Sequence, residues 1–226
     1  MSELLPAIEI ETAPNPTFSV IWLHGLGADG NDFVSIVPEL GLPKDIAVRF
    51  LFPHAPRIPV TVNNGYVMRA WYDIEALDAD NNRRADEAGI LASCRSIRAL
   101  IERENARGVP TRQIVLAGFS QGGAMAYTAG LTHPDALAGI IALSAYIPSE
   151  NLLTENLSAA NRRAPIFAAH GSADDVLPLR LGELARDTLQ QYDFAIEWHT
   201  YSMAHSVCLP EIAAVGSWLR ARLAES

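Results

Sequence analysis

Short apolar segments and longer segments of helical periodicity alternate along the chain. The apolar segments are rich in Val, Ile and Phe and are bounded by turn residues, a pattern typical of strands that are covered on both faces of a sheet. Six of them are predicted to be strands: Phe18–Leu23, Ile46–Phe52, Gln113–Gly118, Gly139–Leu143, Pro165–Ala169 and Ala195–Tyr201.

Helical patterns lie between these strands. The clearest runs from about Asp86 to Arg107, where Ile90, Cys94, Ile97 and Ile101 fall on one helical face and Gly108 ends the pattern. Four others are predicted at Asp32–Leu40, Gly122–Thr132, Leu179–Gln191 and Pro210–Leu223. The alternation of strand and helix predicts an α/β fold with a mostly parallel central sheet flanked by helices.

Two connections interrupt this alternation. The first, Pro53–Arg84, carries β-type residues on both sides of Asn63-Asn64-Gly65, a turn sequence suited to positive φ, and so predicts a small hairpin. The second, Ala145–Arg163, is polar. Neither is long enough for a helical cap, so we expect no large cap domain and an open, shallow substrate site.

Composition limits the partners of the chain. All 226 residues are expected to form a single domain, with residues 1 to about 16 as an N-terminal extension or edge segment. The net charge of −9 argues against a nucleic-acid partner, which would need clustered Lys and Arg. The N-terminal residues resemble no secretory signal and no apolar run could cross a bilayer, so we expect a cytoplasmic protein without stable membrane insertion. Cys94 and Cys208 are expected to be free thiols.

The candidate nucleophile is Ser120, in the sequence Gly118-Phe119-Ser120-Gln121-Gly122. This is the Gly-x-Ser-x-Gly pattern of a nucleophile elbow, which chance alone should produce in roughly one of fourteen chains of this length. Its position makes it more specific, because a predicted buried strand comes directly before it and a predicted helix directly after. The alternative is a serine that only caps the helix.

A serine hydroxyl needs a base, and in this arrangement an acid and then a histidine follow it along the chain. Asp174 and Asp175 both follow the fifth predicted strand. We prefer Asp174, because Asp175 is placed to cap the next helix. His205, in the loop after the last predicted strand, is the candidate base. His170 and His199 lie at the end of a strand and inside one, where packing roles are expected.

The candidate oxyanion hole, which would bind the negative oxygen of a tetrahedral intermediate, involves two backbone N–H groups. The loop His24-Gly25-Leu26-Gly27 follows the first predicted strand, and the N–H of Leu26 with that of Gln121 would form the expected pair. This segment alone is equally consistent with an ordinary glycine turn.

Several ordered motifs together resemble the phospholipase/carboxylesterase family, which includes carboxylesterases and acyl-protein thioesterases. The resemblance covers most of the chain, and it rests on Leu23-His24-Gly25-Leu26-Gly27, Phe52-Pro53-His54-Ala55-Pro56, Val60-Thr61 through Trp71-Tyr72-Asp73, Gly118-Phe119-Ser120-Gln121-Gly122-Gly123 and the segments around Asp174 and His205. It implies the α/β-hydrolase fold and a metal-independent esterase, without a cofactor, that acts on short to medium acyl esters or thioesters. Some relatives remove fatty acyl groups from protein cysteines or from lysophospholipids, so an acylated protein is a further candidate substrate.

The resemblance also implies roles for particular residues. Ser120, Asp174 and His205 would form the triad, and Leu26 and Gln121 would be the oxyanion donors. The substrate-binding residues would be Trp71, Met68 and Leu177, with the loop from 57 to 73 bordering the acyl groove; from the residues alone, Trp71 is equally a core side chain. The chain departs from the family at Ser172, where many relatives carry an acid, and at Ala204, where a glycine usually precedes the histidine.

Other functions stay open at this point. A peptidase or lactone hydrolase could use the same triad, and a non-catalytic ligand-binding protein could share the fold. A binding protein would have no reason to keep serine, acid, base and both glycine loops, which favours the hydrolase. The sequence leaves open the preference for oxygen esters, thioesters or lysophospholipids, the acyl chain length and the oligomeric state, a homodimer included.

Overall fold

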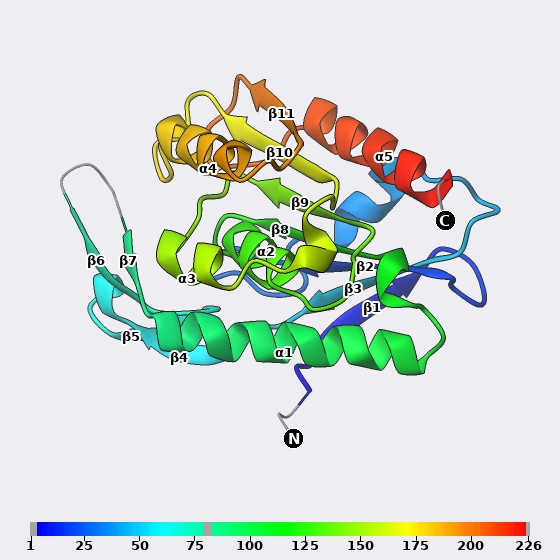
Figure 1. Ribbon diagram of the computed structural model, residues 1–226, viewed down its shortest axis with the longest axis horizontal. Coiled ribbons are helices and arrows are strands. Elements are labelled where there is room, and N and C mark those ends of the chain that lie inside the picture. Colours follow the sequence, from blue (N-terminus) through cyan, green and yellow to red (C-terminus); the bar gives the residue numbers. More distant parts are fainter. Residues whose placement is uncertain (1–3, 79–82, 225–226) are drawn as a thin grey trace.

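A seven-stranded sheet forms the centre of the computed structural model, which describes residues 4–78 and 83–224. The six predicted strands are all present, as β2 (Phe18–Leu23), β3 (Val48–Pro53), β8 (Ile114–Phe119), β9 (Gly139–Leu143), β10 (Ile166–Gly171) and β11 (Ile196–Tyr201). The seventh, β1 (Ala7–Glu11), comes from the predicted N-terminal segment and pairs antiparallel with β3 at the edge. The strand order is β1-β3-β2-β8-β9-β10-β11, and every other pair is parallel (Figure 1).

Four of the predicted helices are present with bounds shifted by two residues at most: α1 (Glu87–Ala106), α2 (Gln121–Leu131), α4 (Leu179–Gln191) and α5 (Leu209–Ala224). The fifth prediction was wrong in type, because Val34–Leu40 forms the 3₁₀ helix η1. Pro38 lies inside it and has no N–H to donate, which disfavours a regular α-helix. The polar connection after β9 contains the short helix α3 (Glu150–Glu155), capped by the Ser149 hydroxyl, and the 3₁₀ turn η4 (Ala159–Asn161).

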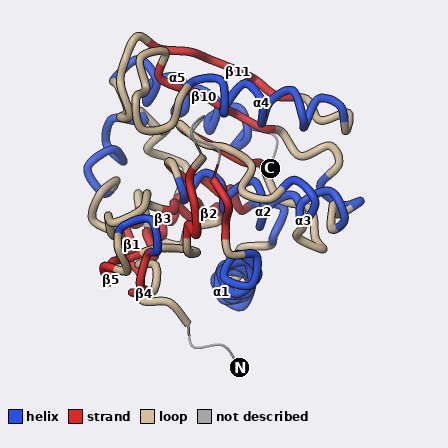
Figure 2. The backbone as a smooth tube through the Cα atoms, turned by 90° about the vertical axis from the view of Figure 1, so that its left-hand side faces the viewer, coloured by secondary structure: helices blue, strands red, loops and turns tan. Residues whose placement is uncertain are grey.

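The sheet separates two hydrophobic cores, which explains why its strands are apolar at consecutive positions. In β2, Val20 and Trp22 pack with η1 and α5, whereas Ile21 and Leu23 pack with α1, α2 and α4. Figure 2 shows β2 and β3 in the interior, with α1, α2 and α5 around them. A mostly parallel sheet with helices on both faces and this strand order is the expected α/β-hydrolase fold.

The long connection after β3 forms two small hairpins instead of a cap. The predicted hairpin consists of β4 (Arg57–Val60), the 3₁₀ turn η2 (Thr61–Asn63) and β5 (Tyr66–Arg69), with Asn64 and Gly65 at positive φ as the turn sequence indicates. A second hairpin, β6 (Ile74–Leu77) with β7 (Arg83–Ala85), projects from the body of the protein (Figure 1). Within residues 4–78 and 83–224 no large cap domain is present.

The helices in the described part of the chain are too short or too polar to cross a bilayer.

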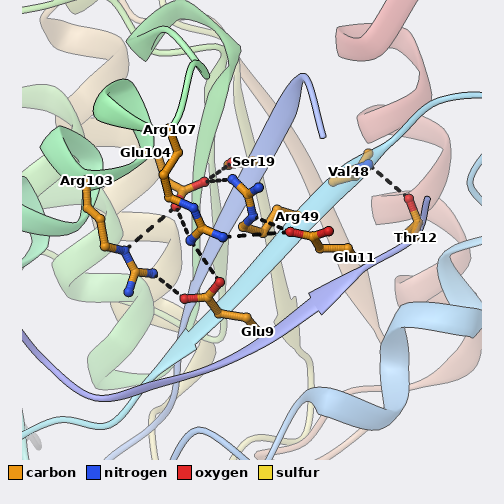
Figure 3. A network of polar contacts seen from close by, with 9 residues as sticks. All are labelled: Glu9, Glu11, Thr12, Ser19, Val48, Arg49, Arg103, Glu104 and Arg107. Atoms are coloured by element: carbon orange, nitrogen blue, oxygen red, sulfur yellow. Dashed lines mark hydrogen bonds and ion pairs between the residues drawn. The ribbon is translucent and has the colours of Figure 1, made fainter. Parts of the chain in front are cut away.

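A buried ionic network ties α1 to the amino-terminal strands (Figure 3). Its centre is Glu104 on α1, whose side chain is fully buried. The carboxylate accepts hydrogen bonds from the Ser19 hydroxyl at 2.6 Å, from Arg49 at 2.8 Å and from Arg107 at 3.0 Å. Arg107 also pairs with Glu9 on β1 at 2.8 Å. The network therefore joins α1, β1, β2 and β3.

We expect Glu104→Ala to lower the free energy of unfolding by about 3–5 kcal/mol, because the buried Arg49 guanidinium loses its buried carboxylate partner and keeps only the more exposed Glu11. Chemical denaturation followed by circular dichroism measures this difference. The matched control is Glu75→Ala, which breaks the exposed ion pair with Arg84 and should cost less than about 1 kcal/mol. Equal losses in both variants would contradict the assignment of Glu104 as the centre of the network.

Candidate active site

Ser120 lies in a sharp turn between β8 and α2. Its backbone has φ 55° and ψ −120°, a conformation that non-glycine residues rarely adopt and that often marks a functional position. The flanking glycines make the turn sterically feasible. A Cβ on Gly118 would lie 2.3 Å from the Gly122 carbonyl, and a Cβ on Gly122 would lie 2.2 Å from the Leu23 carbonyl oxygen. The Gly-x-Ser-x-Gly sequence thus forms the strand–turn–helix that its pattern predicts.

The structure brings Ser120, His205 and Asp174 together at the carboxyl edge of the sheet. His205 Nε2 lies 2.9 Å from the Ser120 hydroxyl oxygen, and His205 Nδ1 lies 2.6 Å from Asp174 Oδ2. The three residues follow β8, β10 and β11, whose parallel carboxyl ends face the same side. They form one continuous hydrogen-bonded chain from carboxylate to hydroxyl.

Both oxygens of Asp174 are engaged, which fixes its orientation. While Oδ2 faces His205, Oδ1 accepts backbone N–H bonds from Val176 at 3.0 Å and Leu177 at 2.7 Å, and the side chain is fully buried. Asp175 is exposed, and α4 begins after Pro178 with no side-chain cap, so the helix-capping alternative for Asp175 is not what the structure shows. Of the two aspartates, the geometry places Asp174 against the histidine.

Backbone hydrogen bonds hold the acid loop and the base loop together. The Ala173 N–H donates to the Met203 carbonyl at 3.0 Å, and Gly171 allows the approach, since a Cβ there would lie 2.5 Å from the carbonyl oxygens of Met203 and Ala204. With Ala204 in place of the usual glycine, the His205 ring still contacts both its partners.

The other two candidate histidines occupy different positions. His170 is buried beneath the acid loop, where Nε2 lies 2.8 Å from the Leu177 carbonyl oxygen and 3.5 Å from Asp174 Oδ2. Burial lowers the pKa of His170, so a neutral ring packs below the carboxylate. His199 lies in β11, stacked on Phe167.

Leu26 and Gln121 line the same cleft as Ser120 and His205. The loop after β2 approaches the elbow closely, since a Cβ on Gly25 would lie 3.5 Å from Ser120 Cβ. The Gln121 side chain is buried and fixes the start of α2. Its Oε1 accepts the Trp71 N–H at 2.9 Å, and its Nε2 donates to the Tyr72 carbonyl at 2.8 Å. Because α2 begins at Gln121, directly after Ser120, its N-terminus, the positive end of the helix dipole, lies at the reacting position.

The cleft has a volume of about 230 Å³. The sequence prediction missed seven of its lining residues: Ala28, Asp32, Ile74, Arg83, Phe119, Tyr146 and Val176. Tyr146 and Val176 closely follow β9 and β10, so their positions after strand ends could have identified them. Nothing in the local sequence distinguishes Arg83, which reaches the site through the projecting hairpin. A second hollow of about 170 Å³ adjoins the cleft and shares Arg83 and Tyr146 with it.

The three residues predicted to bind substrate lie outside the lining of both hollows. Trp71 and Leu177 are each only 1% exposed. The Trp71 indole donates to the His24 carbonyl at 2.9 Å, so it supports the loop after β2 from below. Met68 is half-buried beside Gly27 of that loop. The loop from 57 to 73 thus supports the loop after β2 and does not line the cleft.

No group of three or more His, Cys, Asp or Glu side chains within 4–78 and 83–224 is arranged to hold a metal ion.

The fold, together with a Ser–His–Asp chain at the carboxyl edge of the sheet, places this protein in the class of serine hydrolases with the α/β-hydrolase fold.

Comparison with known proteins gives the family. The sequence profile of the phospholipase/carboxylesterase family matches residues 6–223. Acyl-protein thioesterase 1 of Neurospora crassa is 42% identical over 227 residues, which cover 97% of this chain and 91% of that protein. The chain belongs to the phospholipase/carboxylesterase family.

Solved structures agree with this assignment. The crystal structure of Arabidopsis thaliana SOBER1 is similar with a TM-score of 0.85 at 30% identity, covering 91% of this chain and 99% of that one. Acyl-protein thioesterase 2 of Zea mays also gives a TM-score of 0.85, at 26% identity, covering 96% of this chain and 99% of its own.

Proposed function

We propose that this protein hydrolyses short to medium acyl esters and thioesters through an acyl-enzyme on Ser120. The observation that carries the proposal is the hydrogen-bonded chain from Asp174 through His205 to Ser120, which ends in an open cleft. A hydroxyl that donates to an imidazole oriented by a carboxylate is an activated nucleophile. Membership of a family of ester hydrolases supports the same reaction.

In the first half of the reaction, the Ser120 oxygen attacks the substrate carbonyl carbon while His205 Nε2 takes the hydroxyl proton. Asp174 stays ionised and stabilises the imidazolium that forms. When the tetrahedral intermediate collapses, the imidazolium gives the proton to the departing alcohol or thiol, and the acyl group remains on Ser120. Water then repeats the sequence, with His205 as its base, and releases the carboxylic acid.

The negative oxygen of each tetrahedral intermediate would accept hydrogen bonds from the N–H groups of Leu26 and Gln121. Such donors act most strongly in a site with little water, and loss of one typically costs about 3 kcal/mol of transition-state stabilisation. The N-terminus of α2 adds a favourable dipole at the same position.

The acyl chain is proposed to run from Ser120 past Tyr146 into the second hollow. Tyr146 and Arg83 line both hollows, so the two are neighbours. The far wall of the second hollow includes apolar side chains from α4, among them Leu181, Leu184 and Ala185. A chain of medium length would bury its methylenes there, at about 0.8 kcal/mol each.

Replacing Leu184 with the larger Trp should shorten the acyl chain that the site accepts. Because about two methylenes would lose their burial, kcat/KM for a dodecanoyl ester should fall about tenfold, while kcat/KM for an acetyl ester changes less than about twofold. Rates across a series of p-nitrophenyl esters measure this. The control is Leu91→Trp, at an exposed position of α1 outside both hollows. A uniform loss over all chain lengths would argue against this route.

An acylated protein cysteine is the second candidate substrate. Its support is the 42% identity to a Neurospora crassa protein named acyl-protein thioesterase 1, together with a site that no large cap formed by the described residues covers. The test uses the same series of acyl lengths prepared as thioesters, together with an S-acylated peptide. A kcat/KM for the thioester that is equal to or above that of the matched oxygen ester supports the proposal. A cytoplasmic location and a homodimer remain predictions.

A further inference from the structure

The peptide unit between Gly25 and Leu26 carries the proposed oxyanion donor. In a trans peptide the carbonyl of one residue and the N–H of the next point in opposite directions. The Gly25 carbonyl accepts two hydrogen bonds, from His24 Nδ1 at 2.7 Å and from the Ala28 N–H at 3.2 Å. Holding this carbonyl therefore also fixes the direction of the Leu26 N–H.

The hydrogen-bond partners of His24 determine its tautomer. The Ala55 N–H donates to His24 Nε2 at 3.0 Å, so Nε2 carries no proton. A neutral imidazole then has its single proton on Nδ1, where it donates to the Gly25 carbonyl oxygen. Burial lowers the pKa of His24 to about 4, which keeps the ring neutral near pH 7.

The surroundings hold the ring and the loop rigidly. His24 is 1% exposed and its ring packs 5.3 Å from that of Trp71, whose indole donates to the His24 carbonyl. Beyond the peptide, the Gly27 N–H donates to the Arg69 carbonyl at 2.9 Å, and the Arg69 guanidinium donates to the Ala55 carbonyl at 2.7 Å. Both ends of the loop are thus attached to the segments at 55 and 69.

We propose that His24 is a positioning residue, whose Nδ1–H holds the Gly25 carbonyl and so directs the Leu26 N–H toward the oxyanion. This inference rests on the proposed function. Glycines on both sides of Leu26 give the peptide little resistance to a flip, which would turn a carbonyl oxygen toward the developing negative charge. Leu26 lines the cleft beside Ser120, as the proposal requires.

Two substitutions at position 24 separate its two hydrogen bonds. The amide nitrogen of Asn lies near the position of Nδ1, so His24→Asn can keep the bond to Gly25. The amide oxygen of Gln lies near the position of Nε2, so His24→Gln can keep the bond to Ala55. Each variant loses one of the two hydrogen bonds, so the pair is matched in the number of bonds lost.

We expect His24→Gln to lower kcat for an acetyl ester about 10- to 100-fold with KM within about threefold, because the lost interaction acts in the transition state. His24→Asn should stay within about fivefold of the unmodified protein. Binding of a trifluoromethyl ketone, which forms a tetrahedral oxyanion with the serine, should weaken in His24→Gln by the same factor as kcat/KM. Equal losses in both variants, or none in His24→Gln, would overturn the inference.

A measurement on the unmodified protein does not depend on either variant folding. Long-range ¹H–¹⁵N correlation spectra report histidine tautomers, and His24 should show its proton on Nδ1 at pH 7. A proton on Nε2 would overturn the inference. Failure of the proposed function is distinguishable, since it would appear as absent ester hydrolysis and absent ketone binding in the unmodified protein.

Discussion

Ser120→Ala is expected to lower kcat/KM for a small aryl ester at least a thousandfold, because it removes the hydroxyl that His205 contacts and that would carry the acyl group. The oxyanion donors and the cleft remain, so a small residual rate above the uncatalysed reaction should persist. Initial rates with p-nitrophenyl acetate measure the effect, and circular dichroism verifies that the fold is intact.

Ser206→Ala is the matched control for this variant. Ser206 is exposed and adjoins His205, but no contact places it in the hydrogen-bonded chain, so its removal should change kcat/KM less than about threefold. If Ser120→Ala lowered kcat/KM by less than tenfold, the assignment of Ser120 as the nucleophile would be wrong.

Asp174→Asn is expected to lower kcat about 10⁴-fold at neutral pH with little change in structure, the size of effect that this substitution has in other Ser–His–Asp enzymes. The amide oxygen can still accept the N–H groups of Val176 and Leu177. The amide nitrogen then faces His205 Nδ1 and donates to it, which moves the ring proton to Nε2. In that tautomer His205 cannot take the proton of Ser120.

Asp175→Asn tests the same claim from the neighbouring position. Because Asp175 is exposed, this change should leave kcat within about threefold. The reverse outcome, with the large loss in Asp175→Asn, would show that the acid was assigned to the wrong residue. Both variants have the same charge change, so surface electrostatics cannot account for a difference between them.

The fold could be predicted because each strand of the sheet is apolar at consecutive positions. Residues such as Ile21 and Trp22 supply the two cores on opposite faces, and this pattern is local in the sequence. Two of the elements that the prediction missed or assigned to the wrong type show why. β1 is an edge strand whose Glu9 and Glu11 pair with arginines, so it lacks the apolar signal. η1 has a helical pattern, but Pro38 disfavours α geometry.

Proximity of Ser120, Asp174 and His205 could be anticipated because each follows a strand of a parallel sheet, and such strand ends converge. The residues that form the walls of the cleft could not be anticipated in this way. Arg83 reaches the cleft from a projecting hairpin. Trp71 and Leu177, which were predicted to bind substrate, are buried instead. In each case packing between distant segments of the chain sets the contacts. Asp174 was preferred over its neighbour from the sequence, but the two backbone N–H groups that hold its carboxylate could be found only in the structure.

Covalent labelling of the intact protein tests the central claim most directly. A fluorophosphonate reacts preferentially with a serine that a base has activated, and its adduct mimics the tetrahedral intermediate on that oxygen. Intact-mass analysis and peptide mapping should find one adduct, on Ser120, formed far more slowly in His205→Ala. No adduct on the unmodified protein, or an adduct on a different serine, would contradict the account.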